Sequence, residues 1–271
     1  MRAWCRAALS EWRSPHETHE LETSLGRTHV VSLGSGEQVC VYLPGTNFSA
    51  ASSTVVLQAL ATHFRVYAVD VPGQPGLSAD VRPRDEVLGY AAWLADVVAW
   101  MRARHPDARV VLVGHSRGAA VALSAEPESV HGLALLSPAG LIAVRPTLRM
   151  LRATAPWLLR RDDPGSRRLL QFMSDPVHAP STQLVEWMTL VARTCRTTGA
   201  PAPYPDTLVS QWRGRNVRIV VGDSDVFFPV NRLRKASLDK LGIDPAVVEH
   251  AGHLLGDEES VRVSNLVADL L

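Results

Sequence analysis

The sequence predicts an α/β protein with a mostly parallel sheet, and three observations carry this prediction. Short runs of Val, Leu and Ala recur along the chain, as buried strands do. Amphipathic segments of helical period separate these runs, which is the order of parallel strands joined by crossover helices. The chain has 271 residues, of which 46% are hydrophobic and 20% charged, so it can fill a sizeable single core. This composition argues against a disordered chain.

The first forty residues predict a strand region followed by a hairpin. The two hairpin strands, 28–33 and 38–43, are separated by Gly34-Ser35-Gly36, a turn-forming tripeptide. Helices and strands alternate after the hairpin. The elements expected there are a helix over 50–62, a strand over 65–69, a helix over 85–104, a strand over 109–113, a helix from Ser116 and a strand near 133–136.

The stretch 142–216 interrupts this alternation, because it is helical in pattern, rich in Arg and Trp, and punctuated by prolines. We expect an insertion that forms a helical cap or lid, so that the core of the fold consists of residues 1–141 and 217–271. The alternation resumes with a strand over 217–221, a helix through Lys240, a strand over 247–249 and a helix from about Asp257.

The net charge, the lengths of the apolar runs and the cysteine spacing indicate which partners the protein binds and in which compartment it lies. Twenty-eight Lys and Arg against 27 Asp and Glu leave a net charge of +1, which excludes the basic field that nucleic-acid binding draws on. No apolar run is long enough for a membrane span, and the N-terminus lacks the apolar core of a secretory signal. Cys5, Cys40 and Cys195 form no CxxC pair. We expect a cytoplasmic protein with a small-molecule partner, no metal and no cofactor; nothing in the sequence supports an oligomer.

The most informative motif is Gly114-His115-Ser116-Arg117-Gly118, which follows a predicted buried strand and opens a predicted helix. GxSxG by itself is a weak pattern. Between a strand and a helix, however, its glycines permit the sharp turn that holds a serine Oγ above the sheet edge. Ser116 is therefore the predicted nucleophile, and a serine that only caps the helix is the alternative.

A serine hydroxyl needs a base, and in this chain order an acid should come first and a histidine later. Two carboxylates, Asp223 and Asp225, follow the strand expected over 217–221, and Asp225 is preferred. His253 follows the last expected strand, with Gly252 before it to let the backbone come close. We assign His253 as the base; for two further histidines a structural role is expected, His115 and His250.

These motifs, taken in order, make the sequence similar to the α/β-hydrolase fold superfamily, in its esterase, lipase and small-molecule hydrolase branch with an inserted cap. The likeness covers nearly the whole chain and includes the loops Leu43-Pro44-Gly45-Thr46-Asn47, Asp70-Val71-Pro72-Gly73 and Leu136-Ser137-Pro138. It implies a twisted, mostly parallel sheet of about eight strands flanked by helices. It also implies an oxyanion hole made by the backbone N–H groups of Thr46 and Arg117. Pro44-Gly45 stands where relatives commonly have His-Gly.

The function expected from this resemblance is a cofactor-independent serine hydrolase. It would cleave a small carboxylic ester, lactone or thioester through an acyl-enzyme on Ser116. The alternatives are a non-hydrolytic enzyme of the same fold, such as a cyclase, C–C bond-cleaving or elimination enzyme, and a non-catalytic ligand-binding relative. Candidates for the substrate pocket are Asn47, Phe48, Trp157, Trp187 and Met188. The cap residues among them could instead form the cap's own core.

Overall fold

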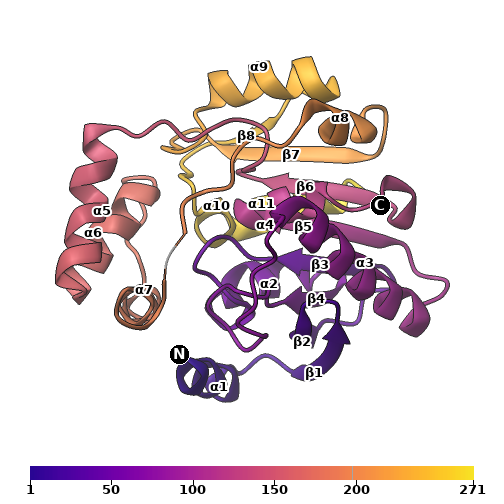
Figure 1. Ribbon diagram of the computed structural model, residues 1–271, viewed down its shortest axis with the longest axis horizontal. Helices are drawn as coiled ribbons and strands as arrows, with labels where there is room; N and C mark the ends of the chain where they lie inside the picture. Colours follow the sequence, from indigo (N-terminus) through magenta and orange to yellow (C-terminus); the bar gives the residue numbers. More distant parts are fainter. Residues whose placement is uncertain (197) are drawn as a thin grey trace.

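A computed structural model describes residues 1–196 and 198–271. In this described part, eight strands form one twisted sheet in the order β1-β2-β4-β3-β5-β6-β7-β8 (Figure 1). All pairings from β4 to β8 are parallel, and only β2 pairs antiparallel with its neighbours. The predicted mostly parallel sheet of about eight strands is therefore confirmed. The strands are β1 His16–Thr23, β2 Gly26–Leu33, β3 Val39–Leu43, β4 Arg65–Val69, β5 Val110–His115, β6 Gly132–Leu136, β7 Val217–Gly222 and β8 Ala246–Val248.

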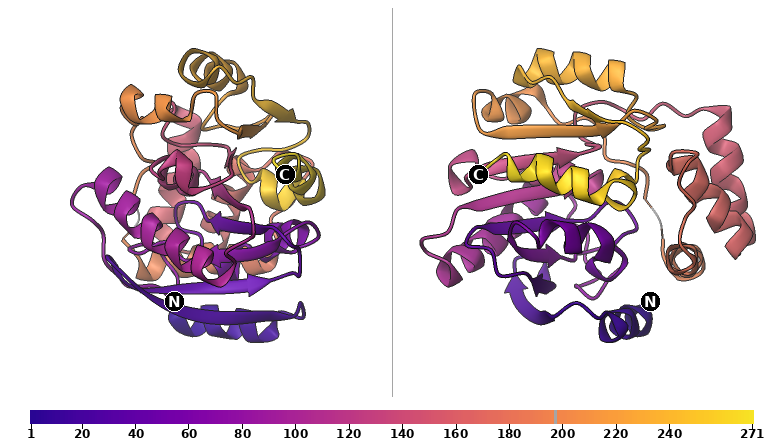
Figure 2. Two further views of the ribbon diagram at one scale, coloured as in Figure 1. Left: turned by 90° about the vertical axis from the view of Figure 1, so that its right-hand side faces the viewer. Right: turned by 180° about the vertical axis from the view of Figure 1, so that it is seen from behind.

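Helices cover both faces of the sheet, because its central strands are apolar on both sides. Along β5, Val111 and Val113 belong to one hydrophobic cluster, whereas Val110 and Leu112 belong to the other. The first cluster is completed by α2 (Thr54–Leu60) and α11 (Ser260–Ala268), the second by α3 (Glu86–Arg104), α4 (Arg117–Leu123) and α9 (Val230–Leu241). Figure 2 shows the C-terminal helix on the face opposite to α3 and α4. No helix in the described residues is both long and apolar enough to cross a membrane.

The predicted hairpin of 28–33 and 38–43 is wrong. β2 and β3 are not neighbours, because β4 lies between them and pairs with both. The glycines that suggested a turn serve a close backbone approach: a Cβ at Gly36 would lie 2.7 Å from the carbonyl oxygen of His63, just before β4. The actual hairpin joins β1 to β2, with Thr23 opposite Gly26. A turn signal is local, whereas the choice of strand partner depends on burial across the whole sheet.

The strand region expected at the N-terminus begins instead with a helix, α1 (Arg2–Glu11). Its buried residues Cys5, Ala8 and Leu9 recur with helical spacing, a signal that was present in the sequence. Arg2 ties the helix to the core by donating to the carbonyls of Leu77 and Ser78, each at 2.7 Å. The helix thus belongs to the packed fold.

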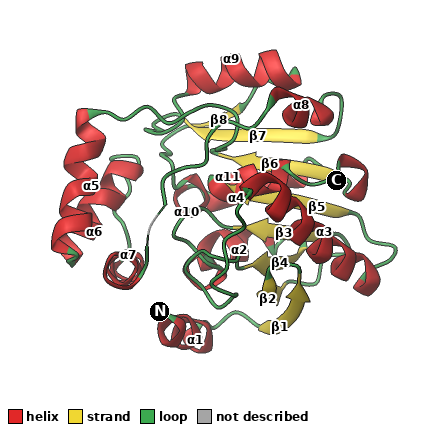
Figure 3. Cartoon of the chain, viewed as in Figure 1, coloured by secondary structure: helices red, strands yellow, loops and turns green. Residues whose placement is uncertain are grey.

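The segment 142–216 contains two groups of helices. The first, α5 (Leu148–Arg160), α6 (Asp163–Met173) and α7 (Thr182–Thr194), lies beyond the carboxyl ends of the parallel strands and consists of helices and loops only (Figure 3). The second, α8 (Asp206–Val209) with the 3₁₀ turn Ser210–Trp212, packs on α9. Trp212 is buried there and donates to the Leu123 carbonyl at 3.0 Å. The end of the segment therefore packs on α4 and α9, which cover the sheet, rather than on α5–α7.

Candidate active site

Ser116 lies in a sharp turn between β5 and α4. Its backbone has φ 51° and ψ −111°, a conformation that costs a non-glycine residue about 1–3 kcal/mol and recurs at functional sites. The flanking glycines make the turn sterically possible. A Cβ at Gly118 would overlap the Leu43 carbonyl, and one at Gly114 would overlap the Gly118 carbonyl. The predicted elbow geometry is present, and it presents Ser116 at the carboxyl edge of the sheet.

Asp225 and His253 form a buried hydrogen-bonded pair beside this turn. His253 Nδ1 donates to Asp225 Oδ2 at 3.0 Å, while Oδ1 accepts the backbone N–H groups of Phe227 and Phe228 at 2.8 and 2.9 Å. Burial disfavours the charged carboxylate, but the charge of His253 and these hydrogen bonds hold the pKa of Asp225 below its usual value. Because Nδ1 carries the donated hydrogen, Nε2 of the neutral ring is free to accept a proton.

The other candidate acid, Asp223, is placed differently. It is exposed, and the one hydrogen bond that its carboxylate makes in the described part of the chain is to the Ala251 N–H, at 3.3 Å. It makes no hydrogen bond to His253 in the described chain. The structure therefore brings Asp225, and not Asp223, to the histidine.

A cavity of about 510 Å³ joins the candidate residues, with both Ser116 and His253 in its wall. No hydrogen bond links their side chains in the described residues; in unliganded enzymes such bonds are often long and tighten when the substrate binds. The Phe227 and His253 rings pack in a T-shaped arrangement, with centroids 4.8 Å apart and planes inclined by 87°. This packing restricts the imidazole to an orientation beside the cavity.

The two candidate oxyanion donors are the backbone N–H groups of Thr46 and Arg117. Neither donates to another group in the described residues, and that of Arg117 is one of the free N–H groups of the first turn of α4. The loop that carries Thr46 is held at the next residue, Asn47, which has a left-handed backbone with φ 68°. The Asn47 N–H donates to Gln74 Oε1 at 3.2 Å, and its carbonyl accepts Trp187 Nε1–H at 2.8 Å. Two side chains from distant segments thus hold this loop.

His115 lies in the cavity wall, and its ring is hydrogen-bonded to the backbone of His253, which favours a structural role. Its Nε2–H donates to the His253 carbonyl at 2.8 Å, and its ring lies 5.0 Å from the His253 ring. Burial, and then the neighbouring His253, lower the pKa of His115 to about 3, so the ring is neutral at pH 7. His250, in contrast, is an exposed residue with φ 59° in the turn before His253.

The side chain of Arg117 has a structural role that the sequence did not indicate. The guanidinium is almost fully buried and pairs with Glu86, at the start of α3, at 3.0 Å. It also donates to the Thr46 hydroxyl at 3.3 Å, and to the Thr198 hydroxyl and Gly199 carbonyl at 3.1 and 2.8 Å. One side chain therefore ties the candidate oxyanion loop to a segment that lines the cavity. A cation at the second variable position of GxSxG is uninformative in sequence, because its partners are distant along the chain.

We expect Arg117→Met to lower kcat/KM for ester hydrolysis by about 10- to 100-fold, because displacing a positioned group by about 1 Å can cost that much. The backbone N–H and Ser116 remain, so slow covalent labelling of the serine persists. Steady-state kinetics test this, with Arg218→Met as the matched control, since Arg218 makes only a partly exposed pair with Asp269. Equal activity of the two variants would remove the positioning role.

The proposed pocket residues separate into two sets. Asn47, Phe48 and Met188 line the cavity. Trp157 and Trp187 do not: Trp157 is buried among the helices and donates to the Met188 carbonyl at 2.8 Å, and Trp187 donates to Asn47 as described. The remaining large lining residues are apolar and include Val144, Met150, Leu169, Met173, Phe227 and Phe228.

Comparisons with known proteins agree with this architecture. The chain matches the model of the alpha/beta hydrolase family over residues 40–266. It is similar to the carboxylesterase YbfK of Bacillus subtilis (strain 168), with 24% identity over 276 residues that cover 97% of this chain and 90% of the relative. The structure of carboxylesterase CesB (YbfK) from Bacillus subtilis superposes with a TM-score of 0.79 at 20% identity, covering 99% and 95% of the two chains. Naproxen esterase (carboxylesterase NP) from Bacillus subtilis superposes at 0.77 and 20%, covering 98% and 95%.

Proposed function

Because the chain belongs to the alpha/beta hydrolase family, we propose that it is a serine hydrolase that cleaves a carboxylic ester through an acyl-enzyme on Ser116. The observation that carries this proposal is the buried Asp225–His253 pair, whose imidazole shares a cavity with a serine in a strained turn. The relatives named above are carboxylesterases, which favours ester hydrolysis over the non-hydrolytic and ligand-binding alternatives.

The mechanism follows from the positions of these groups. Ser116 Oγ attacks the ester carbonyl carbon while His253 Nε2 takes the hydroxyl proton, and Asp225 stabilises the imidazolium that forms. The negative charge on the carbonyl oxygen is met by the N–H groups of Thr46 and Arg117, each worth about 3 kcal/mol of barrier lowering. His253 returns the proton to the departing alcohol. Water then repeats the sequence on the acyl-enzyme and releases the acid.

The cavity supports an uncharged substrate of modest size. Its volume is about 510 Å³ and, among the described residues, no Asp, Glu, Lys or Arg side chain lines it. A charged substituent would therefore lose its hydration without gaining a partner. Lactones and thioesters present the same carbonyl to Ser116 and belong to the proposed class. We place α5–α7 as the cap, since Met150, Leu169 and Met188 from these helices line the cavity.

We also propose a cytoplasmic location. Cys5, Cys40 and Cys195 are all free thiols, and two of them are buried. A reducing compartment is where free thiols persist.

The experiment that tests the function combines covalent labelling with hydrolysis. A fluorophosphonate should add once per chain, at Ser116, as measured by intact mass and peptide mapping. Neutral p-nitrophenyl esters from acetate to octanoate should be hydrolysed. If a folded protein with native circular dichroism shows neither an adduct nor hydrolysis, the proposal is wrong.

The charge of the substrate provides a separate prediction. We expect an acyl chain that ends in a carboxylate to lower kcat/KM at least about 10-fold relative to the neutral chain of equal length, because burying an unpaired charge is costly. p-Nitrophenyl valerate and the mono-p-nitrophenyl ester of glutaric acid form a matched pair. Equal rates would show that a cation outside the apolar wall receives the carboxylate.

A further inference from the structure

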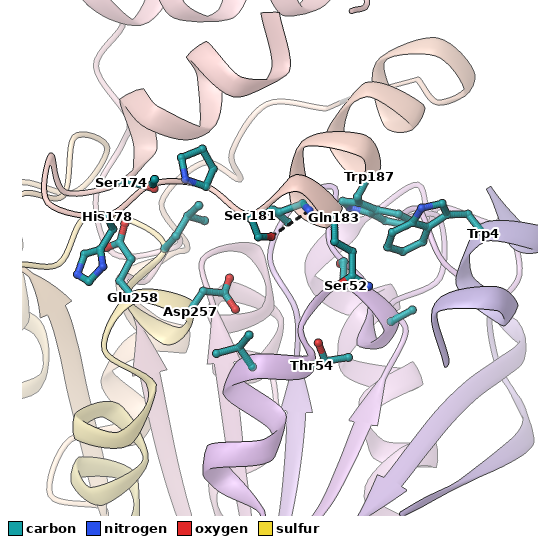
Figure 4. A pocket seen from close by; sticks show the side chains of 16 residues that line it. Trp4, Ser52, Thr54, Ser174, His178, Ser181, Gln183, Trp187, Asp257 and Glu258 are labelled. Atoms are coloured by element: carbon teal, nitrogen blue, oxygen red, sulfur yellow. Dashed lines mark hydrogen bonds between the residues drawn. The ribbon is translucent and has the colours of Figure 1, made fainter. Parts of the chain in front are cut away.

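A second, smaller cavity of about 160 Å³ lies between α1, α2, α7, α10 (Leu255–Glu258) and the connection that follows α6 (Figure 4). A single water needs about 10–15 Å³ by this measure, so the space admits a small molecule. The two cavities adjoin at three places, where one of two consecutive residues lines each cavity: Met173 and Ser174, Met188 and Trp187, His253 and Leu254. It is a distinct space beside the proposed catalytic site.

One carboxylate in this cavity has no partner. Asp257 lines the wall, and its side chain makes no hydrogen bond or ion pair within the described residues. The neighbouring acid is already engaged: Glu258 accepts the backbone N–H of Asp175 at 3.0 Å and also that of Gly252. Figure 4 shows the Asp257 carboxylate pointing into the space between His178 on one side and Trp4 and Trp187 on the other.

The surroundings of Asp257 are unfavourable for a charged carboxylate. Burial, followed by the charge of Glu258, raises the pKa of Asp257 to about 7. A carboxylate in such surroundings gains from any cation that enters, because the cation replaces the hydration that burial removed. Glycine, alanine or leucine at this position would carry no such cost.

At one end of the same cavity the partly exposed Trp4 packs on the fully buried Trp187. Trp4 from α1 and Trp187 from α7 contact each other with ring centroids 4.7 Å apart and planes inclined by 42°. The Thr54 hydroxyl, also in the wall, makes no hydrogen bond within the described chain. Tryptophan faces together with a carboxylate are the groups that bind ammonium ions in proteins.

We propose that this cavity binds a small organic ammonium ion, with Asp257 as its counter-ion and Trp4, backed by the buried Trp187, as its aromatic wall. A metal ion fits less well, since no group of three or more His, Cys, Asp or Glu side chains in the described residues is placed to hold one. The proposal does not depend on the hydrolase activity, because none of these three residues lines the catalytic cavity.

Choline and its uncharged carbon isostere, 3,3-dimethylbutan-1-ol, are the probes that test this. Titrated into the full chain at constant ionic strength and followed by tryptophan fluorescence and thermal shift, choline should saturate and the alcohol should bind at least about 10-fold more weakly. Asp257→Asn should weaken choline binding at least about 10-fold. Asp239→Asn, the same change at an exposed site on α9, should leave it unchanged.

Two results would overturn the proposal. One is the absence of saturable choline binding to the wild-type chain at 100 mM. The other is equal binding by Asp257→Asn, which would place the cation elsewhere. Circular dichroism of the variant separates lost binding from lost structure, and the neutral amide, which keeps the shape of aspartate, is expected to fold.

The pH dependence of stability gives an independent check on the unpaired carboxylate. The groups facing Asp257 are Glu258 on α10, His178 from the connection after α6, and Tyr42 on β3, whose pKa is raised by burial and then by Asp257. The folded pKa of Asp257, about 7, exceeds the value of 3.8 for a freely exposed aspartate, so the folded chain holds this proton more tightly than the unfolded chain does. The contribution of Asp257 to the free energy of unfolding is therefore greatest below pH 4 and declines as the pH rises to 7.

We therefore expect Asp257→Asn to raise the melting temperature at pH 8 relative to wild type and to leave it nearly unchanged at pH 4. Thermal denaturation at the two pH values, with Asp239→Asn as control, measures the difference. A variant that is less stable than wild type at pH 8 would mean that the carboxylate makes a stabilising contact, which contradicts an unpaired counter-ion.

Discussion

Replacing Ser116 by alanine is expected to lower kcat/KM for ester hydrolysis by at least about 10³-fold, because removing the nucleophile leaves only the oxyanion donors and binding. The fold should be retained, since the strained backbone at φ 51° depends on Gly114 and Gly118 rather than on the hydroxyl. Steady-state kinetics on p-nitrophenyl butyrate and intact mass after fluorophosphonate treatment measure both consequences. The adduct should disappear with the activity.

Ser124→Ala is the matched control for this change. Ser124 is a buried serine at the end of the same helix, and its hydroxyl donates to the Val121 carbonyl at 2.7 Å, away from the cavity. It should keep activity and labelling within about twofold of wild type, because it removes only a local hydrogen bond. If Ser116→Ala retains near wild-type activity, or if the adduct maps to another residue, Ser116 is not the nucleophile.

Asp225→Asn is expected to lower kcat about 10³- to 10⁴-fold, the cost of presenting the wrong histidine tautomer. The reason lies in the hydrogen bonds around this carboxylate. The amide oxygen will stay on the N–H groups of Phe227 and Phe228, which turns the NH₂ group toward His253 Nδ1. Nδ1 must then accept, the proton moves to Nε2, and the ring can no longer take the proton of Ser116.

Asp223→Asn tests the same chemistry two residues away. Asp223 is exposed, and within the described chain its carboxylate accepts a hydrogen bond from the Ala251 N–H alone, so its amide should keep kcat within about threefold of wild type, as surface changes usually do. Both variants should melt within a few degrees of wild type. If Asp223→Asn loses more activity than Asp225→Asn, the acid has been assigned to the wrong residue.

The parts of the fold that sequence predicted well are those specified by local patterns. Apolar runs such as β5 and the alternation of strands with helices indicated the parallel sheet, because strands buried on both faces must be apolar throughout. The hairpin failed at Gly34 and Gly36, where a local turn signal marked a close approach to the chain before β4. Strand pairing is decided by contacts distant in sequence, which no short pattern contains.

The candidate site likewise has a part that local sequence patterns predicted and a part that they did not. The sequence by itself determined which residues stand at the ends of strands: Ser116 after β5, Asp225 after β7 and His253 after β8. Parallel strands bring their carboxyl ends to one edge, so chain order and strand assignment were sufficient to place these residues near each other.

Only the tertiary structure decided which side chains surround them. It turned Met188 into the cavity and its neighbour Trp187 onto the Asn47 carbonyl, although both belong to one apolar stretch of α7. It also buried the Arg117 guanidinium among four partners, whereas the Asp257 carboxylate has none among the residues that the structure describes. The physical reason is that the direction of a helical side chain depends on how the helix packs against distant segments, and composition and spacing do not carry that information.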